Sequence, residues 1–185
     1  FAAKLSAGVD DLDLNLGGFV QRVNADLVGK VVNIASRCAG FLRKKFDNTM
    51  SAQCSEPALV QSFIDAGENI AALYEAREFN RAMREVIALA DRANQYIDEN
   101  KPWVMAKEEG REQEVQDVCS TGINLFRVLI TYLKPVLPKM AERAEDFLQI
   151  NVDWHNLETP LTGHTLNTFQ PLLQRVDSDH VEAMV

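Results

Sequence analysis

The sequence has few of the residues that enzymes and metal sites most often use. Among its 185 residues there are only three cysteines and three histidines, and the cysteines lack the paired spacing of a zinc site. The histidines, His155, His164 and His180, have no cysteine or carboxylate at ligand spacing. A glycine-rich phosphate loop is also missing, because Gly17-Gly18 is too short a motif. We therefore expect no catalytic residue, metal site or cofactor in this chain.

Long hydrophobic runs are absent too. A membrane-spanning helix needs about 20 consecutive apolar residues, and no run approaches that length. The segment that opens the chain, residues 1–5, lacks the pattern of a signal peptide and does not begin with methionine. We expect no membrane association and a chain that is a fragment of a longer protein. Cys38 and Cys119 fall on apolar helix faces, which is typical of reduced, buried thiols in a cytoplasmic protein.

Positive charge is scarce, with 19 Lys and Arg against 27 Asp and Glu, and the net charge is −8. This balance excludes a protein that binds nucleic acid non-specifically over its whole surface. One stretch differs, because no Asp or Glu lies between Leu27 and Phe46. It holds the basic residues Lys30, Arg37, Arg43, Lys44 and Lys45. Any affinity for an anionic partner should therefore be local to this stretch.

Hydrophobic periodicity predicts an all-α fold. Apolar residues recur at steps of three and four in several segments, which is the period of one helix face. The helical patterns begin near Phe19, Pro57, Phe79, Glu114 and Pro138, and the first ends at Phe46. The preceding Gly17-Gly18 favours a kink or a loop. Short connectors between the patterns predict a helical bundle of about five helices, with the fourth pattern nearly enclosed.

The length of the chain fits a single domain. We expect residues 1–18 to be a connector, residues 19–150 to form the bundle, and residues 151–185 to form a loop-rich tail. The tail is punctuated by proline and glycine, and it still carries leucines and Phe169 that need burial. We therefore expect the tail to fold back on the bundle.

The acid-free helix carries a polar stripe beside its apolar one. Lys30, Asn33, Arg37 and Lys44 follow each other at steps of three, four and seven, so they share a face. An Asn can read a base edge with a donor and an acceptor, and an Arg can make forked hydrogen bonds to a base or a phosphate. An ordinary solvated helix face is the alternative interpretation.

A helix break provides the second candidate feature. Pro102 interrupts a helical pattern, and Trp103 follows directly. A Trp at such a junction most often plugs a core, but it can also stack on an unpaired RNA base. The preceding helix has its own polar stripe, which consists of Asp91, Asn94 and Asp98. Exposed surface is one interpretation, which we favour for Asp91, and rejection of wrong nucleotides beside a base pocket is the other.

Several motifs are spread over nearly the whole chain. They are Asp10-Asp11-x-Asp13-Leu14-Asn15-Leu16, Asn33-x-Ala35-Ser36-Arg37 with Phe41 and Phe46-Asp47, Pro102-Trp103-x-x-Ala106-Lys107, Gly122-Ile123-Asn124-Leu125-Phe126-Arg127, and Tyr132-Leu133-Lys134-Pro135-Val136-Leu137-Pro138. Their order and spacing together resemble the C-terminal anticodon-binding domain of bacterial methionyl-tRNA synthetase.

The resemblance implies roles for particular residues. Asn33 and Arg37 would read base edges of a CAU anticodon, and Trp103 would stack under its first base, held in position by Pro102. The full set consists of Asn33, Arg37, Pro102, Trp103 and Lys107 for anticodon binding, Asp91, Asn94 and Asp98 for discrimination among anticodons, and Arg175 for a contact from the tail.

The resemblance also implies a wider context. The catalytic part of the family carries His-Ile-Gly-His and Lys-Met-Ser-Lys-Ser signatures, and neither occurs here, so we expect this chain to be inactive alone. The expected parent is a cytoplasmic ligase that joins methionine to its tRNA with ATP. ATP would bind to its catalytic part. Whether zinc also binds there is left open by the resemblance. Expected partners are methionine tRNA and that catalytic part, with no membrane and no DNA. The rival interpretation is a helical protein-interaction module in which Trp103 is an interface hot spot or a core plug.

Overall fold

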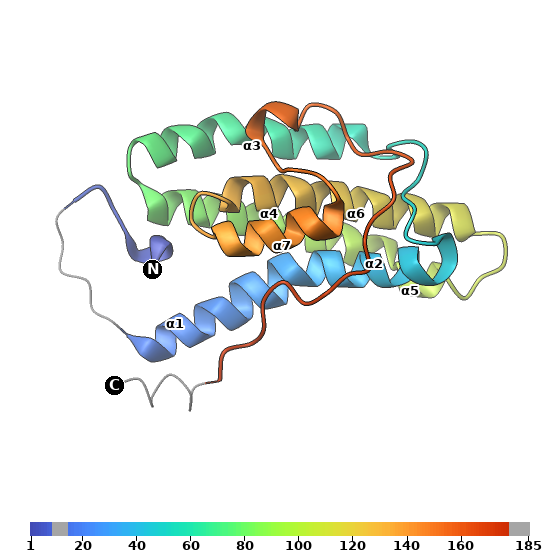
Figure 1. The fold of residues 1–185 in the computed structure, drawn as a ribbon, viewed down its shortest axis with the longest axis horizontal. Helices are drawn as coiled ribbons and strands as arrows, with labels where there is room; N and C mark the ends of the chain where they lie inside the picture. The colour runs from blue at the N-terminus through green and yellow to red at the C-terminus, as the bar shows by residue number, and fades with distance from the viewer. Residues whose placement is uncertain (9–14, 178–185) are drawn as a thin grey trace.

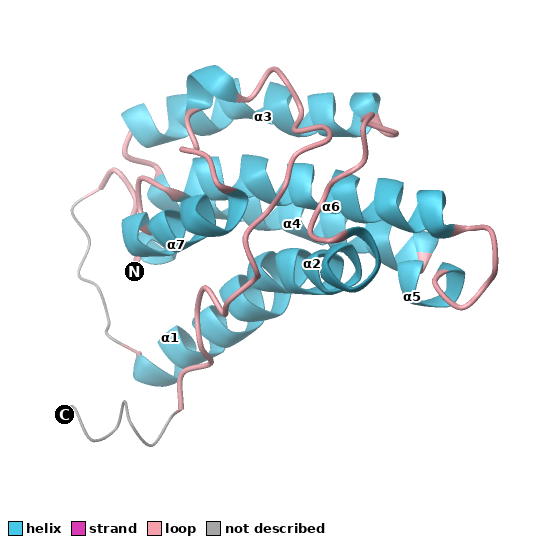
Figure 2. Cartoon of the chain, turned by 45° about the vertical axis from the view of Figure 1, so that its right-hand side comes forward, coloured by secondary structure: helices cyan, strands magenta, loops and turns pink. Residues whose placement is uncertain are grey.

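The structure, a computed structural model, describes residues 1–8 and 15–177. The described elements are η1 (Ala2–Lys4), α1 (Leu16–Arg22), the π-helix η2 (Val23–Val32), α2 (Asn33–Phe46), α3 (Pro57–Glu75), α4 (Phe79–Asn100), α5 (Pro102–Met105), α6 (Glu112–Leu133), α7 (Pro138–Leu148) and η3 (Trp154–Asn156). Because α1, η2 and α2 follow each other without a break, these ranges contain five long helices and no strand, which confirms the all-α bundle (Figure 2). No described helix is long and apolar enough to span a membrane. The motif at residues 10–14 and His180 lie outside the described residues.

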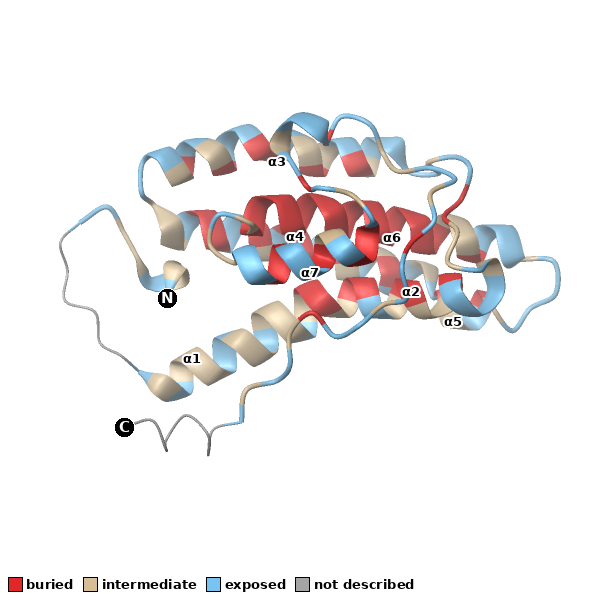
Figure 3. Ribbon diagram, in the orientation of Figure 1, coloured by how far each residue is buried: buried red, intermediate tan, exposed pale blue. Residues whose placement is uncertain are grey.

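Helix α6 is the centre of the bundle. Every residue of α6 from Val118 to Leu133 is buried, as the enclosed sequence pattern predicts (Figure 3). Helices α2, α3, α4 and α7 pack around it. Two glycines permit close packing, because a Cβ atom on Gly122 would lie 2.5 Å from Cys38 Sγ and one on Gly67 would lie 2.6 Å from the Tyr132 hydroxyl. A larger side chain at either position would force a neighbouring helix outward.

The first helical run departs from the sequence prediction at its start. Gly17 and Gly18 lie inside α1 and form neither a kink nor a loop, so that prediction was wrong. The reason is a helix cap: the Asn15 side chain accepts a hydrogen bond from the Gly18 N–H at 2.8 Å, which satisfies an otherwise free donor of the first turn. The run ends as expected, with Asp47 in the left-handed conformation at φ 50°.

The tail folds back on the bundle as predicted, throughout its described part. It passes the C-terminal end of α7, crosses α2 and then runs beside α1 (Figure 1). Its side chains Leu157, Leu166 and Leu172 are buried against the bundle. Farther along, the backbone of Val176 and the Asn24 side chain exchange two hydrogen bonds of 2.8 Å. These contacts fix the described part of the tail on the bundle.

The cysteines are free thiols, and Cys38 and Cys119 are buried as expected. Cys38 comes from α2 and Cys119 from α6, at the closest approach of the two helices. A hydrogen bond with Cys38, together with burial, raises the pKa of the Cys119 thiol far above its ordinary value. This thiol is therefore protonated in the folded protein, as a buried structural cysteine is.

Candidate nucleic-acid interface

The basic face of the continuous run of η2 and α2, which carries Lys30 in η2 and Asn33 and Arg37 in α2, lies beside the second half of α4. Three pairs of side chains join the two segments, and in each pair the partners are separated by the same 61 positions. The pairs are Lys30 with Asp91, Asn33 with Asn94, and Arg37 with Asp98. The two polar stripes found in the sequence are therefore opposite halves of one contact. We call this contact the α2–α4 ladder.

The ends of the ladder are ion pairs. The ammonium of Lys30 lies 2.9 Å from both carboxylate oxygens of Asp91, and Arg37 Nη2 donates to Asp98 Oδ1 at 2.6 Å. Both acids are exposed, and the Asp98 side chain retains 59% of its accessible surface against 26% for Arg37. Ion pairs this open to water contribute about 0–1 kcal/mol. A stronger anion can therefore replace either acid.

The middle pair fixes the orientation of Asn33. Asn94 Nδ2 donates to the carbonyl oxygens of Lys30, at 3.1 Å, and Ala90, at 2.9 Å. Since a carbonyl only accepts, the amide nitrogen of Asn94 must face these two oxygens, and its Oδ1 faces Asn33. Asn33 Nδ2 donates to that Oδ1 at 3.3 Å. One N–H and the Oδ1 of Asn33 remain for another partner.

Trp103 completes the surface from the helix break. Helix α4 ends at Asn100, Lys101 adopts the left-handed conformation at φ 49°, and Pro102 begins α5. The short turn places Trp103 beside Arg37, whose guanidinium carbon lies 4.7 Å from the indole centroid. Trp103 is half-buried, so it is not a fully enclosed core residue. The Arg37 guanidinium thus contacts the Asp98 carboxylate and the indole ring.

A residue that the sequence analysis did not assign to the site supports this turn. The ammonium of Lys45, near the end of α2, donates to the Ala106 carbonyl at 3.0 Å, directly after α5. This bond ties the turn that carries Trp103 to the helix that carries Arg37. A signal was present in the sequence, because Lys45 follows Arg37 by about two helical turns and so lies near the same face.

The remaining predicted residues lie at different distances from this centre. Pro102 is buried at the start of α5, and Lys107 is exposed in the turn that follows it. Arg175 is exposed and precedes Val176, which is bonded to Asn24 near the start of η2. That position is roughly 15–20 Å along the helical run from Arg37, so the structure does not bring Arg175 to the cluster. Among the described residues no His, Cys, Asp and Glu side chains form a group of three that could hold a metal ion.

The fold of this chain occurs as part of known structures. It matches the apo form of Mycobacterium tuberculosis methionyl-tRNA synthetase with a TM-score of 0.80 and 19% sequence identity, over 87% of this chain and 34% of that one. The same synthetase in complex with methionyl-adenylate matches with a TM-score of 0.76 and 19% identity, over 84% and 33% of the two chains. The chain thus spans about a third of these proteins.

A family model gives the more specific result. The model for the anticodon-binding domain of methionyl-tRNA ligase matches residues 48–184, which is well over half of the chain. The chain belongs to this family, as the motifs in its sequence predict. The matched range includes Asp98, Trp103 and Lys107, whereas Asn33 and Arg37 precede it.

Proposed function

We propose that this chain recognises the CAU anticodon of methionine tRNA, and that Asn33, Arg37 and Trp103 perform the recognition. The observation that carries the proposal is the convergence of these three side chains, which come from segments about 65 residues apart in sequence, on one half-exposed surface. Partners on α4 orient two of them. Pre-oriented polar groups beside an aromatic ring suit single-stranded RNA loops.

Asn33 is the base-reading residue that the geometry constrains most. Because Asn94 holds the Asn33 amide in one orientation, the remaining acceptor and donor have fixed positions. Cytosine and adenine present an amino donor next to a ring nitrogen that accepts. Uracil and guanine instead present a carbonyl acceptor next to a ring N–H that donates. A fixed amide can therefore distinguish the two kinds of base. Asn94 is accordingly a positioning residue for this reading.

Arg37 and Trp103 form the stacking part of the proposed site. The guanidinium occupies one side of the indole in the free protein, and both planar groups can stack on a base. A base that stacks on Trp103 either uses the other side of the ring or displaces Arg37. In the second case Arg37 exchanges Asp98 for an edge or phosphate of the RNA. One base–aromatic stack contributes about 1–3 kcal/mol.

Asp91 and Asp98 fit a role in discrimination. Both carboxylates are exposed, so a base or phosphate in the wrong position beside them would meet a negative charge. A cognate anticodon has to interact with Arg37 more strongly than Asp98 does. Lys107 is placed to attract the phosphates of the loop, and Arg175 has a more remote role along the tail.

The parent protein is the remaining part of the proposal. It is a cytoplasmic methionine–tRNA ligase that uses ATP, with methionine tRNA and its own catalytic part as partners of this chain. The chain itself, folded as a single domain, is inactive in aminoacylation. Family membership and the match to synthetase structures support this context.

The proposal is tested by measuring the affinity of the chain for a CAU anticodon stem-loop. Trp103→Ala should weaken binding by one to two decades, and Asn33→Ala and Arg37→Ala should each weaken it by about tenfold or more. Isothermal titration calorimetry at low salt gives these affinities directly.

Arg81→Ala is the matched control for Arg37→Ala. Arg81 is an exposed arginine at the other end of α4, about 25 Å along the helix from Asp98, so its loss should change affinity little. Equal losses in Arg37→Ala and Arg81→Ala would indicate general electrostatic attraction and refute recognition at this surface.

A further inference from the structure

A second cluster of polar groups lies away from the α2–α4 ladder, around Arg127 of α6. This side chain is only 5% exposed. Its guanidinium donates to two tail carbonyl oxygens, that of Thr159 at 2.7 Å and that of Asn156. The Nε atom is buried without a hydrogen-bond partner. None of the ion pairs among the described residues includes Arg127.

An uncompensated buried charge is unusual in this chain. The net charge is −8, so carboxylates are plentiful, yet Arg127 is held by carbonyl dipoles alone. Burial lowers the pKa of the Arg127 guanidinium, because the loss of water disfavours its charged form. A buried charge without a counter-charge is costly, and structures normally provide a partner.

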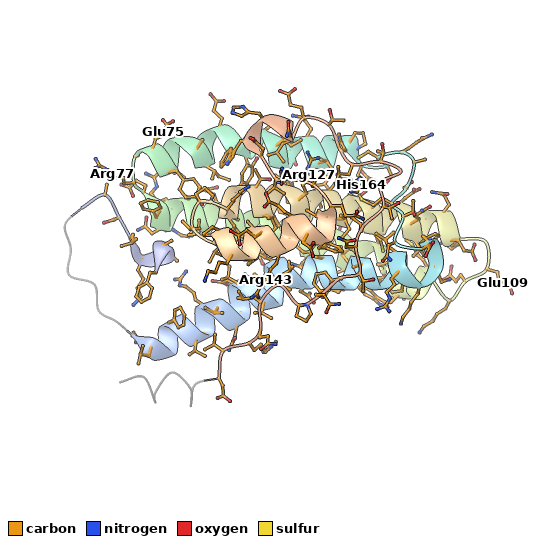
Figure 4. All side chains as sticks on the ribbon, viewed as in Figure 1. Glu75, Arg77, Glu109, Arg127, Arg143 and His164 are labelled. Carbon is orange, nitrogen blue, oxygen red and sulfur yellow. The ribbon has the colours of Figure 1, made fainter. Side chains whose placement is uncertain are left out.

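Arg127 lines a cavity of about 420 Å³ between α6 and the tail. The other polar residues of its wall are His155, Asn156, Glu158, Thr159, Thr162 and His164. Figure 4 shows Arg127 and His164 close together where the tail crosses the bundle. Among the described residues that line the cavity, Glu158 is the one with a negatively charged side chain.

The wall of the cavity is held firmly. Asn124, one turn before Arg127, accepts a hydrogen bond from the Leu161 N–H at 2.8 Å and donates to the Leu161 carbonyl at 3.0 Å. The His164 ring is fixed as well, because its Nε2 lies 2.6 Å from the Leu148 carbonyl and must donate to it. Leu161 and His164 of the cavity wall are therefore held in place by hydrogen bonds to the bundle.

We propose that this cavity, which we call the Arg127 cavity, binds a small tetrahedral oxyanion of the phosphate type. Arg127, Thr159, Thr162 and His155 all line the cavity and are its candidate donors, and the anion supplies a counter-charge for a guanidinium that forms no ion pair with a described residue. Arg is well suited to such oxyanions because its donors match their geometry. The site is separate from the anticodon surface and does not depend on the proposed function.

The test is a titration of the whole chain with inorganic phosphate, with chloride at equal ionic strength as the reference, followed by amide NMR. Saturable shifts confined to residues 155–164 and to α6 near Arg127 are expected. Phosphate that shifts no amide in this region, or shifts surface amides generally, would overturn the proposal.

Glu158→Gln is the most informative variant, because it removes the opposing charge from an exposed residue without disturbing the Arg127 hydrogen bonds. It should tighten phosphate binding about fivefold, the effect of one nearby unit charge in a watery environment. Glu142→Gln, an exposed acid on α7 outside the cavity, is the matched control and should leave affinity nearly unchanged. Equal effects of the two variants would contradict a local site.

A phosphate could be free or part of an RNA backbone, and a competition arm separates the two sources. A CAU stem-loop that displaces inorganic phosphate from the cavity would assign the site to RNA. Simultaneous binding of both would assign it to a free oxyanion. Arg127→Lys should abolish phosphate binding, with circular dichroism as the check of folding. Retained affinity in a folded Arg127→Lys variant would also refute the role of the guanidinium.

Discussion

At the scale of single residues, the account depends on the competition for Arg37. Its guanidinium has an acid on one side and an indole ring on the other, and each contact is weak enough to exchange, at about 0–1 kcal/mol. In the free protein, Arg37 is therefore held in position by contacts that another partner can replace. In the proposed recognition, an RNA loop has to bind Arg37 more strongly than Asp98 does, so Asp98 sets a threshold for binding.

Asp98→Asn tests this threshold. The variant should change the free energy of unfolding by no more than about 1 kcal/mol, because the ion pair is exposed. It should raise the affinity for stem-loops with altered anticodons by about fivefold, through removal of one repulsive charge, and so reduce discrimination against them. Affinities for a CAU loop and for single-base variants of that loop measure the effect.

Glu99→Gln is the control for Asp98→Asn. Glu99 is the exposed neighbour of Asp98, and it is bonded to Gln95 on its own helix. If both variants increase binding to every loop equally, Asp98 acts only through net charge and not through Arg37.

The sequence predicts which side chains share a helix face better than it predicts how two faces meet. Asn33, Arg37, Asn94 and Asp98 follow from helical spacing, and Trp103 follows from its place after Pro102. The contact between the two stripes belongs to the tertiary structure. No local sequence pattern predicts it, because the paired residues are 61 positions apart. The propensity of Gly17-Gly18 does not predict a helix here, because the Asn15 cap that stabilises the first turn lies outside the pair.

At the scale of elements, the position of α2 against α6 sets the position of the ladder. The two helices approach closely where Gly122 faces Cys38. The π-helix η2 directly precedes α2, and its Lys30 contributes the first pair of the ladder. Hydrophobic periodicity could not predict the π-helix, because a pattern of apolar steps does not separate wide turns from ordinary ones.

Gly122→Ala should disturb this contact. The new Cβ would lie 2.5 Å from Cys38 Sγ, so α2 would have to shift, at a cost of about 1–3 kcal/mol for an overpacked core. The free energy of unfolding in urea measures the loss. Weaker binding of the CAU loop should accompany it, since Asn33 and Arg37 would move with α2.

Gly40→Ala provides the matched control on α2 itself. A Cβ at Gly40 meets no atom within 4 Å, so the substitution should stabilise the helix by about 0.5–1 kcal/mol. If Gly122→Ala were as stable as Gly40→Ala, the close packing of α2 on α6 would not be a determinant of the fold.

At the scale of the whole molecule, charge is distributed unevenly. The chain has a net charge of −8, yet the last turns of α2 hold Arg43, Lys44 and Lys45, and Lys107 is exposed after the adjacent α5. A local basic surface on an acidic protein attracts an RNA loop in one orientation and repels it elsewhere.

Salt dependence tests this distribution. The logarithm of the affinity for a CAU stem-loop should fall linearly with the logarithm of salt concentration, with a slope of about −2 if three cations neutralise phosphates. Lys107→Ala should reduce the steepness by about 0.7, whereas Lys139→Ala at the start of α7 should not. A slope near zero would favour the protein-interaction module over an RNA-binding domain.

The most direct measurement is the fluorescence of Trp103 in a Trp154→Phe variant, which has one indole, during titration with a CAU stem-loop. The account predicts saturable quenching that is absent with a scrambled anticodon and lost in Asn33→Ala and Arg37→Ala. Binding of the CAU loop with unchanged Trp103 fluorescence, or equal quenching by the scrambled loop, would contradict anticodon recognition at this surface.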